Sequence, residues 1–260
     1  MLRALYSSAT GMKAQETLLD VTANNLANVN TTGFKRSHVN FADLLYATVR
    51  QAGAQSAAGQ QIPVGLQIGS GARAVATTKL FTPGTPQQTG NNLDVAIEGD
   101  GFFQIQMPSG EIRYTRDGSF HMDSAGNLVN ADGYLLQPGI TISPDATAIT
   151  ILPDGTVSTN VNGVETPVGQ IDLARFINPA GLSSTGGNLY AQTTASGDPL
   201  PGQPGLNGLG TLRQGFLEES NVQMVTELIS LITAQRAYEV NARAIRAGDE
   251  MLSTTSQIMR

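Results

Sequence analysis

Two aspartates and two histidines are the residues of this chain whose types and spacing could do chemistry. Asp117 and Asp123 are close enough in sequence for paired acid–base work. However, Asp117 precedes Gly118, and Asp123 lies in the run Asp-Ser-Ala-Gly-Asn; both are turn settings that explain an aspartate without catalysis. His38 and His121 are solitary, so we interpret them as surface or strand residues rather than as a base or metal ligands. The absence of cysteine excludes disulfides and thiolate chemistry.

One glycine-rich segment matches the letters of a dinucleotide-binding fingerprint. Residues 69–74 read Gly-Ser-Gly-Ala-Arg-Ala. A working fingerprint follows a strand and opens a helix, whereas here the stretch from Val75 to Phe81 runs into Pro83 and Gly84. No serine lies in a Gly-x-Ser-x-Gly turn either. The sequence therefore predicts no cofactor, no metal site, no small-molecule substrate and no enzymatic activity.

The composition narrows the class of protein further. Of 260 residues only 14% are charged, against about a quarter in an average soluble protein. The net charge is −6 and only three residues are lysine, so the chain is a poor candidate for binding nucleic acid. It contains no run of about 18 apolar residues that would predict a membrane span. We expect a soluble protein with an unusually uncharged surface.

The N-terminus does not predict a cleavable secretory signal. Polar residues interrupt the first apolar stretch within five positions, whereas such a signal needs an apolar run of about 7–15 residues. Two interpretations remain open: a cytoplasmic protein, or export by a route that does not read such a signal.

The elements that would position any site begin with a helix at each end. Residues 2–29 have helical periodicity and end in an Asn- and Gly-containing turn that closes at Gly33. A second helix is expected from about Ser220 onward, with Ser220 and Gln223 as a capping box. Apolar residues recur every seven positions in both helices: Leu5, Met12, Leu19 and Leu26 in the first, and Met224, Leu231, Tyr238, Ile245, Leu252 and Met259 in the second.

The region between the helices changes character twice. Residues 93–177 alternate apolar and polar side chains between turn signals such as Asp132-Gly133, which predicts an antiparallel sheet domain. Residues 178–211 contain too much Gly and Pro for regular structure. The predicted division is 1–35 for the N-terminal helix, 36–92 for an extended connection, 93–216 for the β-rich domain and 217–260 for the C-terminal helix.

The predicted fold class is α+β. Long terminal helices pair as a coiled-coil-like layer, and an antiparallel β-rich domain is inserted between them, because a strict seven-residue repeat favours a left-handed supercoil. The pattern leaves two arrangements open. The helices form a hairpin on their own β domain, or neighbouring subunits complete the helical layer.

Three separate blocks of the sequence resemble the bacterial flagellar rod and hook family. Residues 19–36, from Leu-Asp-Val-Thr-Ala-Asn-Asn to Gly-Phe-Lys-Arg, are similar to its N-terminal signature. Residues 94–103 and 114–120 resemble its central β domain, and the stretches within 219–241 resemble its C-terminal helix. Within the family the chain is most similar to distal rod members, through its length and through the segment 43–69, which resembles the insertion that follows the first helix in those members.

This resemblance implies a function that spacing alone does not. Such proteins pass unfolded through the flagellar export apparatus and assemble helically into a hollow, periplasm-spanning rod whose inner tube is formed by the terminal helices. The resemblance further implies that the rod carries torque from motor to hook and that the insertion braces neighbouring subunits. The implied partners are copies of the same chain, proximal rod proteins, hook-side subunits, and the peptidoglycan- and outer-membrane-ring proteins. The alternatives are a proximal rod or hook subunit, or a monomeric wall-binding β protein.

Two sets of residues are predicted to make subunit contacts. The apolar set consists of Leu5, Met12, Leu19, Leu26, Leu231, Tyr238, Ile245 and Leu252. The amide set consists of Asn24, Asn25 and Asn28. Three amides so close together are poor choices for helix stability. They either cap or solvate the helix, or they form hydrogen bonds between subunits without the desolvation cost of ions.

Overall fold

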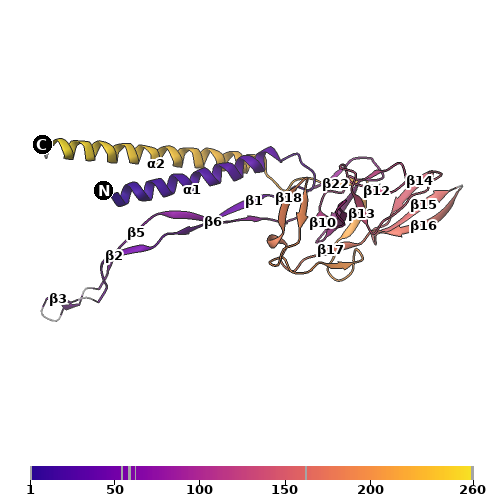
Figure 1. The fold of residues 1–260 in the computed structure, drawn as a ribbon, viewed down its shortest axis with the longest axis horizontal. Coiled ribbons are helices and arrows are strands. Elements are labelled where there is room, and N and C mark those ends of the chain that lie inside the picture. Colours follow the sequence, from indigo (N-terminus) through magenta and orange to yellow (C-terminus); the bar gives the residue numbers. More distant parts are fainter. Residues whose placement is uncertain (1, 54, 58–59, 62, 162, 259–260) are drawn as a thin grey trace. The chain divides into compact units, whose positions relative to one another are not determined.

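The chain folds into two compact units in a computed structural model that describes residues 2–53, 55–57, 60–61, 63–161 and 163–258 (Figure 1). The helix-and-ribbon unit comprises Met1–Ala27, Ser37–Thr78 and Gln223–Arg260. The sheet unit comprises Asn28–Arg36 and Lys79–Val222, so the chain passes between the units four times. A helix near each end and an antiparallel β-rich middle confirm the α+β class. The four-part domain division remains a prediction.

The two terminal helices are α1 (Leu2–Ala27) and α2 (Met224–Ile258). The predicted capping box at the start of α2 is wrong. The helix begins four residues after Ser220, whose Oγ instead accepts a hydrogen bond from the Val222 backbone nitrogen at 3.3 Å. The first turn is closed by the bond from the Glu227 nitrogen to the Gln223 carbonyl. Met259, predicted to continue the repeat, lies outside the described residues.

The helices run antiparallel and contact each other within one chain. Asn25, near the end of α1, donates from Nδ2 to Glu227 Oε2 at the start of α2. At the other end of the pair, a Cβ added to Gly248 of α2 would lie 2.5 Å from the Leu5 side chain of α1. The contact is intramolecular, and the coiled-coil-like supercoil stays a prediction.

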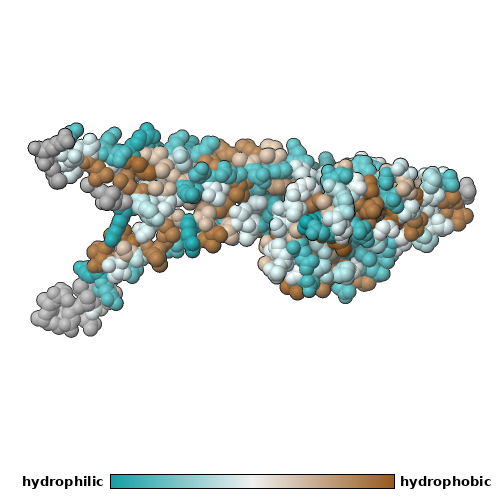
Figure 2. Space-filling model, viewed as in Figure 1, coloured by the Kyte–Doolittle hydropathy of each residue, from teal (hydrophilic) through white to brown (hydrophobic). Residues whose placement is uncertain are grey.

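The connection after α1 forms narrow ribbons rather than a broad sheet. Its apolar side chains are widely exposed, including Leu45 at 89% and Val49 at 57%, and apolar surface is visible on this unit in Figure 2. Two-stranded ribbons are marginally stable alone. The pairs are β1 (Ser37–Asp43) with β6 (Ala72–Lys79), β2 (Tyr46–Arg50) with β5 (Leu66–Gly69), and β3 (Gln55–Ala57) with β4 (Gln60–Gln61).

The sheet unit is built around a nine-stranded sheet, and its described strand pairings are antiparallel, as the alternating pattern predicted. The main path is β11 (His121–Met122), β12 (Leu128–Val129), β13 (Leu135–Gln137), β9 (Phe102–Gln106), β10 (Ile112–Thr115), β19 (Leu189–Ala191) and β18 (Ser183–Gly186), with β17 (Leu173–Arg175) joining β9 to β20 (Leu200–Gly202).

Smaller sheets complete the unit. They are β14 (Ala148–Ile151), β15 (Thr156–Val161) and β16 (Val164–Gln170); β8 (Val95–Glu98) with β21 (Thr211–Gln214); and β7 (Pro86–Gln88) with β22 (Phe216–Glu218).

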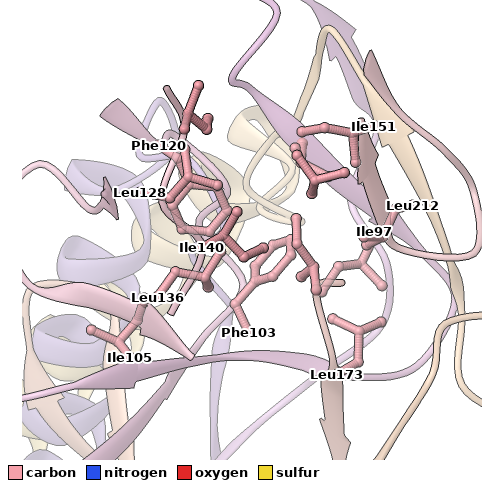
Figure 3. Close-up of a cluster of buried hydrophobic side chains, with 14 of the residues drawn as sticks. Ile97, Phe103, Ile105, Phe120, Leu128, Leu136, Ile140, Ile151, Leu173 and Leu212 are labelled. Atoms are coloured by element: carbon pink, nitrogen blue, oxygen red, sulfur yellow. The ribbon is translucent and has the colours of Figure 1, made fainter. Parts of the chain in front are cut away.

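Strand β9 organises the core because it is covered on both faces. Phe103 points into a mainly aliphatic cluster with Ile105, Leu136 and Leu173 (Figure 3). The neighbouring Phe102 belongs to a second, aromatic cluster. Its rings meet edge to face at centroid distances of 4.7–6.1 Å; the members are Phe81, Phe102, Tyr114, Phe176 and Tyr190.

The prediction that residues 178–211 lack regular structure is wrong. This stretch contains the 3-10 helix Pro179–Gly181 and the strands β18, β19 and β20. Gly186, Gly187 and Asn188 have φ values of 91°, 58° and 58° and form the turn between β18 and β19. The glycine content marks tight turns between short strands rather than an absence of strands.

Candidate functional site: a buried junction and the faces of the terminal helices

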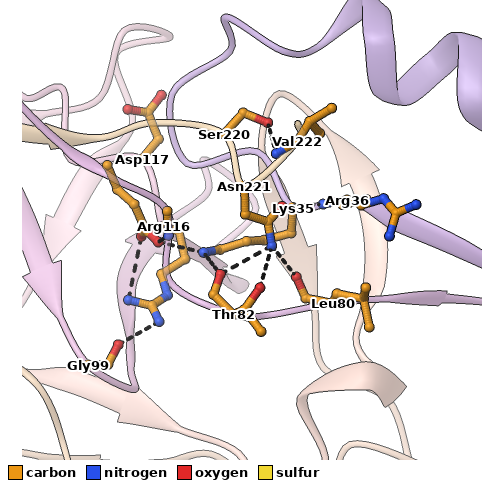
Figure 4. Close-up of polar contacts among 12 residues, drawn as sticks. Lys35, Arg36, Leu80, Thr82, Gly99, Arg116, Asp117, Ser220, Asn221 and Val222 are labelled. Carbon is orange, nitrogen blue, oxygen red and sulfur yellow. Dashed lines mark hydrogen bonds and ion pairs between the residues drawn. The ribbon is translucent and has the colours of Figure 1, made fainter. Parts of the chain in front are cut away.

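Three charged side chains that are far apart in sequence meet inside the sheet unit. Lys35 follows α1 in the chain, Arg116 follows β10 and Glu218 ends β22. Their side chains are 0%, 2% and 3% exposed. Lys35 Nζ donates to Glu218 Oε1 at 2.5 Å and to the Thr82 carbonyl at 2.8 Å. Arg116 donates from Nη2 to the Gly99 carbonyl at 2.6 Å, and its Nη1 lies 3.6 Å from Glu218 Oε2 (Figure 4).

Backbone contacts tie the same segments together. The nitrogen of Gly33 donates to the Glu218 carbonyl, and the nitrogen of Gly84 donates to Glu218 Oε1, each at 2.8 Å. Asn221 Oδ1 accepts from the Arg36 nitrogen at 2.7 Å, while its Nδ2 donates to the Leu80 carbonyl at 2.8 Å (Figure 4). We call residues 33–36, 80–84, 116 and 218–221 the junction.

The electrostatics of the junction are unbalanced, because two cations share one carboxylate. Burial lowers the pKa of Lys35, the Glu218 carboxylate opposes that shift, and Arg116 adds to it. Burial also lowers the pKa of Arg116. The guanidinium lies 5.6 Å from the Phe102 ring centroid, and its Nε has no hydrogen-bond partner in the described part of the chain. Such an ion cluster specifies an arrangement rather than a reaction.

The residues with catalytic potential have structural contacts. Asp117 Oδ1 accepts from Thr32 Oγ1 and from the Ser119 nitrogen, and Asp123 Oδ1 accepts from the Ser124 nitrogen, which confirms their predicted role in turns. Among the described residues, no three His, Asp or Glu side chains are placed to hold a metal ion, and no helix is long and apolar enough to cross a membrane.

The residues of the seven-residue repeat make up only half of the α2 face that contacts α1. Leu231, Ile245 and Leu252 are half-buried, and Tyr238 is 42% exposed. The most buried positions lie between them, three or four residues away: Glu227, Ala234 and Gly248. Asn241 lies at the same spacing, 3.1 Å from a Cβ added to Gly11. The spacing of apolar residues in the sequence could not predict this face, because half of its residues are small or polar.

The predicted α1 residues are not its most buried ones. Leu5, Met12, Leu19 and Leu26 are all half-buried. Thr22 and Asn25 are 3% and 1% exposed, and Asn25 contacts both α2 and the start of β1. The predicted apolar set of α1 therefore retains surface that a further partner could cover.

Asn25 has hydrogen-bond partners within its own chain, and its role between subunits stays a prediction. Its Oδ1 accepts from the Ser37 nitrogen and its Nδ2 donates to the Ser37 carbonyl, each at 2.9 Å, and Nδ2 also contacts Glu227. A buried amide satisfied in this way joins α1 to β1 within one chain. Asn28 Oδ1 accepts from Thr31 Oγ1 in the turn after α1. Asn24 is exposed, and its role between subunits stays a prediction.

An exposed apolar surface covers the first turns of α2. Val225 and Ile229 are 70% and 60% exposed, and Leu228 and Ile232 are also exposed. We call these four residues the α2 apolar face. The neighbouring apolar residue Val222 differs from these four, because it is buried in the sheet unit.

Comparison with known proteins places relatives along the whole chain. A family described as "Flagella basal body rod protein" matches residues 5–35. "Flagellar hook protein FlgE/F/G D1 domain" matches residues 96–159, and "Flagellar basal body rod FlgEFG protein C-terminal" matches residues 213–258.

Individual relatives extend over nearly the full length. The "Flagellar basal-body rod protein FlgG" of Buchnera aphidicola subsp. Schizaphis graminum is 48% identical over 260 residues, covering 99% of this chain and 100% of the relative. FlgG of Borreliella burgdorferi is 46% identical with both chains fully covered. The "Flagellar basal-body rod protein FlgF" of Caulobacter vibrioides is 38% identical, covering 100% of this chain and 96% of the relative.

Proposed function

The chain belongs to the family of flagellar basal-body rod proteins, which are structural subunits rather than enzymes, and on this premise we propose that it forms the distal rod. In this role it polymerises helically into a hollow, rigid drive shaft that transmits torque from motor to hook. Full-length identity of 46–48% to FlgG relatives, against 38% to FlgF, favours the distal over the proximal rod.

The observation that carries self-assembly is the α2 apolar face. Its four large side chains are exposed in the single chain, with Val225 at 70% and Ile229 at 60%. Burying such a side chain contributes about 1.5–3 kcal/mol, and contiguous exposed apolar surface marks an interaction site. The half-buried Leu5, Met12, Leu19 and Leu26 of α1 supply a second apolar surface. Contact of both surfaces with neighbouring copies would build the helical inner tube.

The insertion supports a second kind of subunit contact. Strands β2 and β5 form a two-stranded ribbon with exposed apolar side chains, among them Tyr46 and Leu66 at 56% and 50%. A partner surface would stabilise this ribbon, which alone is marginal. We expect residues 46–69 to brace adjacent subunits and to set the stiffness of the rod. Deleting them should give curved or overly flexible rods in electron micrographs; straight rods of normal stiffness would contradict this role.

The partners and location follow from the same proposal. The rod would span the periplasm inside the peptidoglycan- and outer-membrane-ring proteins, join proximal rod proteins to hook-side subunits, and reach its place through the flagellar export apparatus without a cleaved signal. A weakly charged surface, with 14% charged residues, suits rotation inside a close-fitting ring because it offers few strong ionic attachments.

The decisive experiment is electron microscopy of basal bodies from a strain that lacks this gene. The distal-rod proposal predicts structures that end at the proximal rod. Basal bodies that also lack the proximal rod would assign the chain there, and rods that stop only at the hook would make it a hook subunit. A purified chain that stays monomeric at every concentration would favour a wall-binding β protein.

A further inference from the structure

Glu218 contacts each stretch of chain that enters or leaves the sheet unit. The segment 28–36 is held through Lys35 Nζ on Oε1 and through the Gly33 nitrogen on the Glu218 carbonyl. The segment that begins at Lys79 is held through the Gly84 nitrogen on Oε1. Glu218 itself lies in the segment that leads to α2. One carboxylate therefore joins connections that are far apart in sequence.

The charge of this carboxylate is essential to the cluster. Lys35 and Arg116 are at most 2% exposed, and the contacts of both converge on Glu218. Without Glu218 the interior would hold two cations and no anion, which combines desolvation with like-charge repulsion. Asp100, which also attracts Arg116, is an exposed residue and does not contact Lys35 through any described bond. Burial of the charged Lys35 side chain in the sheet unit therefore depends on Glu218.

We propose that Glu218 is a positioning residue that closes the junction. Thr32 bonds Asp117 and Asn188 without it, but the Lys35 end of the segment 28–36 becomes fixed in the sheet unit only when the C-terminal part of the chain supplies this carboxylate. A chain that stops before residue 218 lacks the closing group. In such a chain the segment after α1 is not fixed in the sheet unit. The inference concerns the single subunit and does not depend on the rod.

Amide hydrogen exchange on the full-length, monomeric chain tests this inference. Glu218→Gln keeps the size of the side chain and removes its charge. We expect the amides of Gly33, Leu80 and Gly84 to exchange at least about tenfold faster, while the amide of Ile105 in β9 keeps its protection. The matched control is Glu219→Gln, which neutralises the exposed neighbouring carboxylate and should leave all four amides unchanged.

A double variant shows whether the charge of Glu218 or merely the packing of its side chain protects the junction. In Lys35→Met/Glu218→Gln, one of the uncompensated cations is gone, so the protection of Gly33 and Leu80 should recover relative to Glu218→Gln alone. Three results would each overturn the proposal. They are a loss of amide protection in the double variant that equals the sum of the losses from the two single substitutions, equally faster exchange of every amide in all variants, and unchanged exchange in Glu218→Gln. If Glu218→Gln does not fold, recovery of a folded double variant supports closure, and failure of both to fold rejects it.

The motility of strains that carry the same variants is measured separately from amide exchange. Because exchange is measured on monomers, junction closure can fail while rods still form. Complete rods in a strain that lacks this gene would contradict the proposed function and would leave the result on the junction unchanged.

Discussion

Gly33 lies where the segment after α1 crosses the backbone beside Arg116. Its φ is +67°, and an added Cβ would lie 2.6 Å from the Asp117 nitrogen. We expect Gly33→Ala to lower the free energy of unfolding by about 2–4 kcal/mol, because neither backbone can move cheaply. Gly110→Ala is the control: its φ is +85° with nothing within 4 Å, so strain alone should cost about 1–2 kcal/mol. Urea denaturation measures both, and equal losses would show that the close approach is unimportant.

Tyr190 makes stability depend on alkaline pH. Burial and the negative charge of Glu218 raise the pKa of this phenol, whereas in the unfolded chain it titrates near its ordinary value of about 10. Above that pH the unfolded state releases a proton that the native state keeps. The free energy of unfolding therefore falls by about 1.4 kcal/mol per pH unit from this group.

The variant Tyr190→Phe removes this dependence. Its stability relative to the original chain should be constant below about pH 9 and should improve steadily from about pH 10 to 11, as measured by urea unfolding at each pH. Parallel curves over that range would mean that Tyr190 ionises equally easily in both states.

At the scale of elements, the periodic signals identified the helices and the strands of the central sheet, but not their partners. Alternation predicted β8, β9 and β10, and α1 ends at Ala27, within two residues of the expected turn. Apolar spacing could not show that Glu227, Ala234 and Gly248 form half of the α2 face toward α1, because these residues are small or charged. Local chemistry also misplaced the start of α2, since Ser220 serves the junction region and not the helix.

Two substitutions on α2 separate the contact within a subunit from contacts between subunits. Ile229 is 60% exposed, so Ile229→Asp should change the free energy of unfolding by less than about 0.5 kcal/mol yet abolish polymerisation. Leu231 is half-buried on the face toward α1, so Leu231→Asp should itself destabilise the subunit by about 1–3 kcal/mol.

Thermal unfolding and sedimentation velocity provide the two readouts. Thr233→Asp places the same charge at an exposed position of α2 and serves as the control that should polymerise normally. Normal polymerisation of Ile229→Asp would remove the α2 apolar face from the interface.

At the scale of the whole molecule, the three charged residues of the junction lie in separate stretches of the sequence, and nothing in their order predicted that they meet. Lys35, Arg116 and Glu218 are separated by 81 and 102 positions, and each looks alone like an ordinary surface charge. The turn after α1 brings Lys35 to Glu218 at the end of β22, and Arg116 reaches the same carboxylate from the end of β10. Burial of charges far apart in sequence is a tertiary property without a local signal.

The small net charge of the chain leads to a prediction about how salt affects assembly. Copies with a net charge of −6 repel weakly, while the proposed contacts are apolar or uncharged. Raising NaCl from about 0.1 M to about 1 M shortens the Debye length from about 10 Å to about 3 Å, which screens the repulsion without weakening apolar burial. The subunit concentration needed for polymerisation, measured by light scattering, should therefore stay constant or fall, and it should fall on warming from about 5 °C to 25 °C. A rise of tenfold or more with salt would mean that ionic contacts, and not the apolar faces of the terminal helices, hold the polymer together.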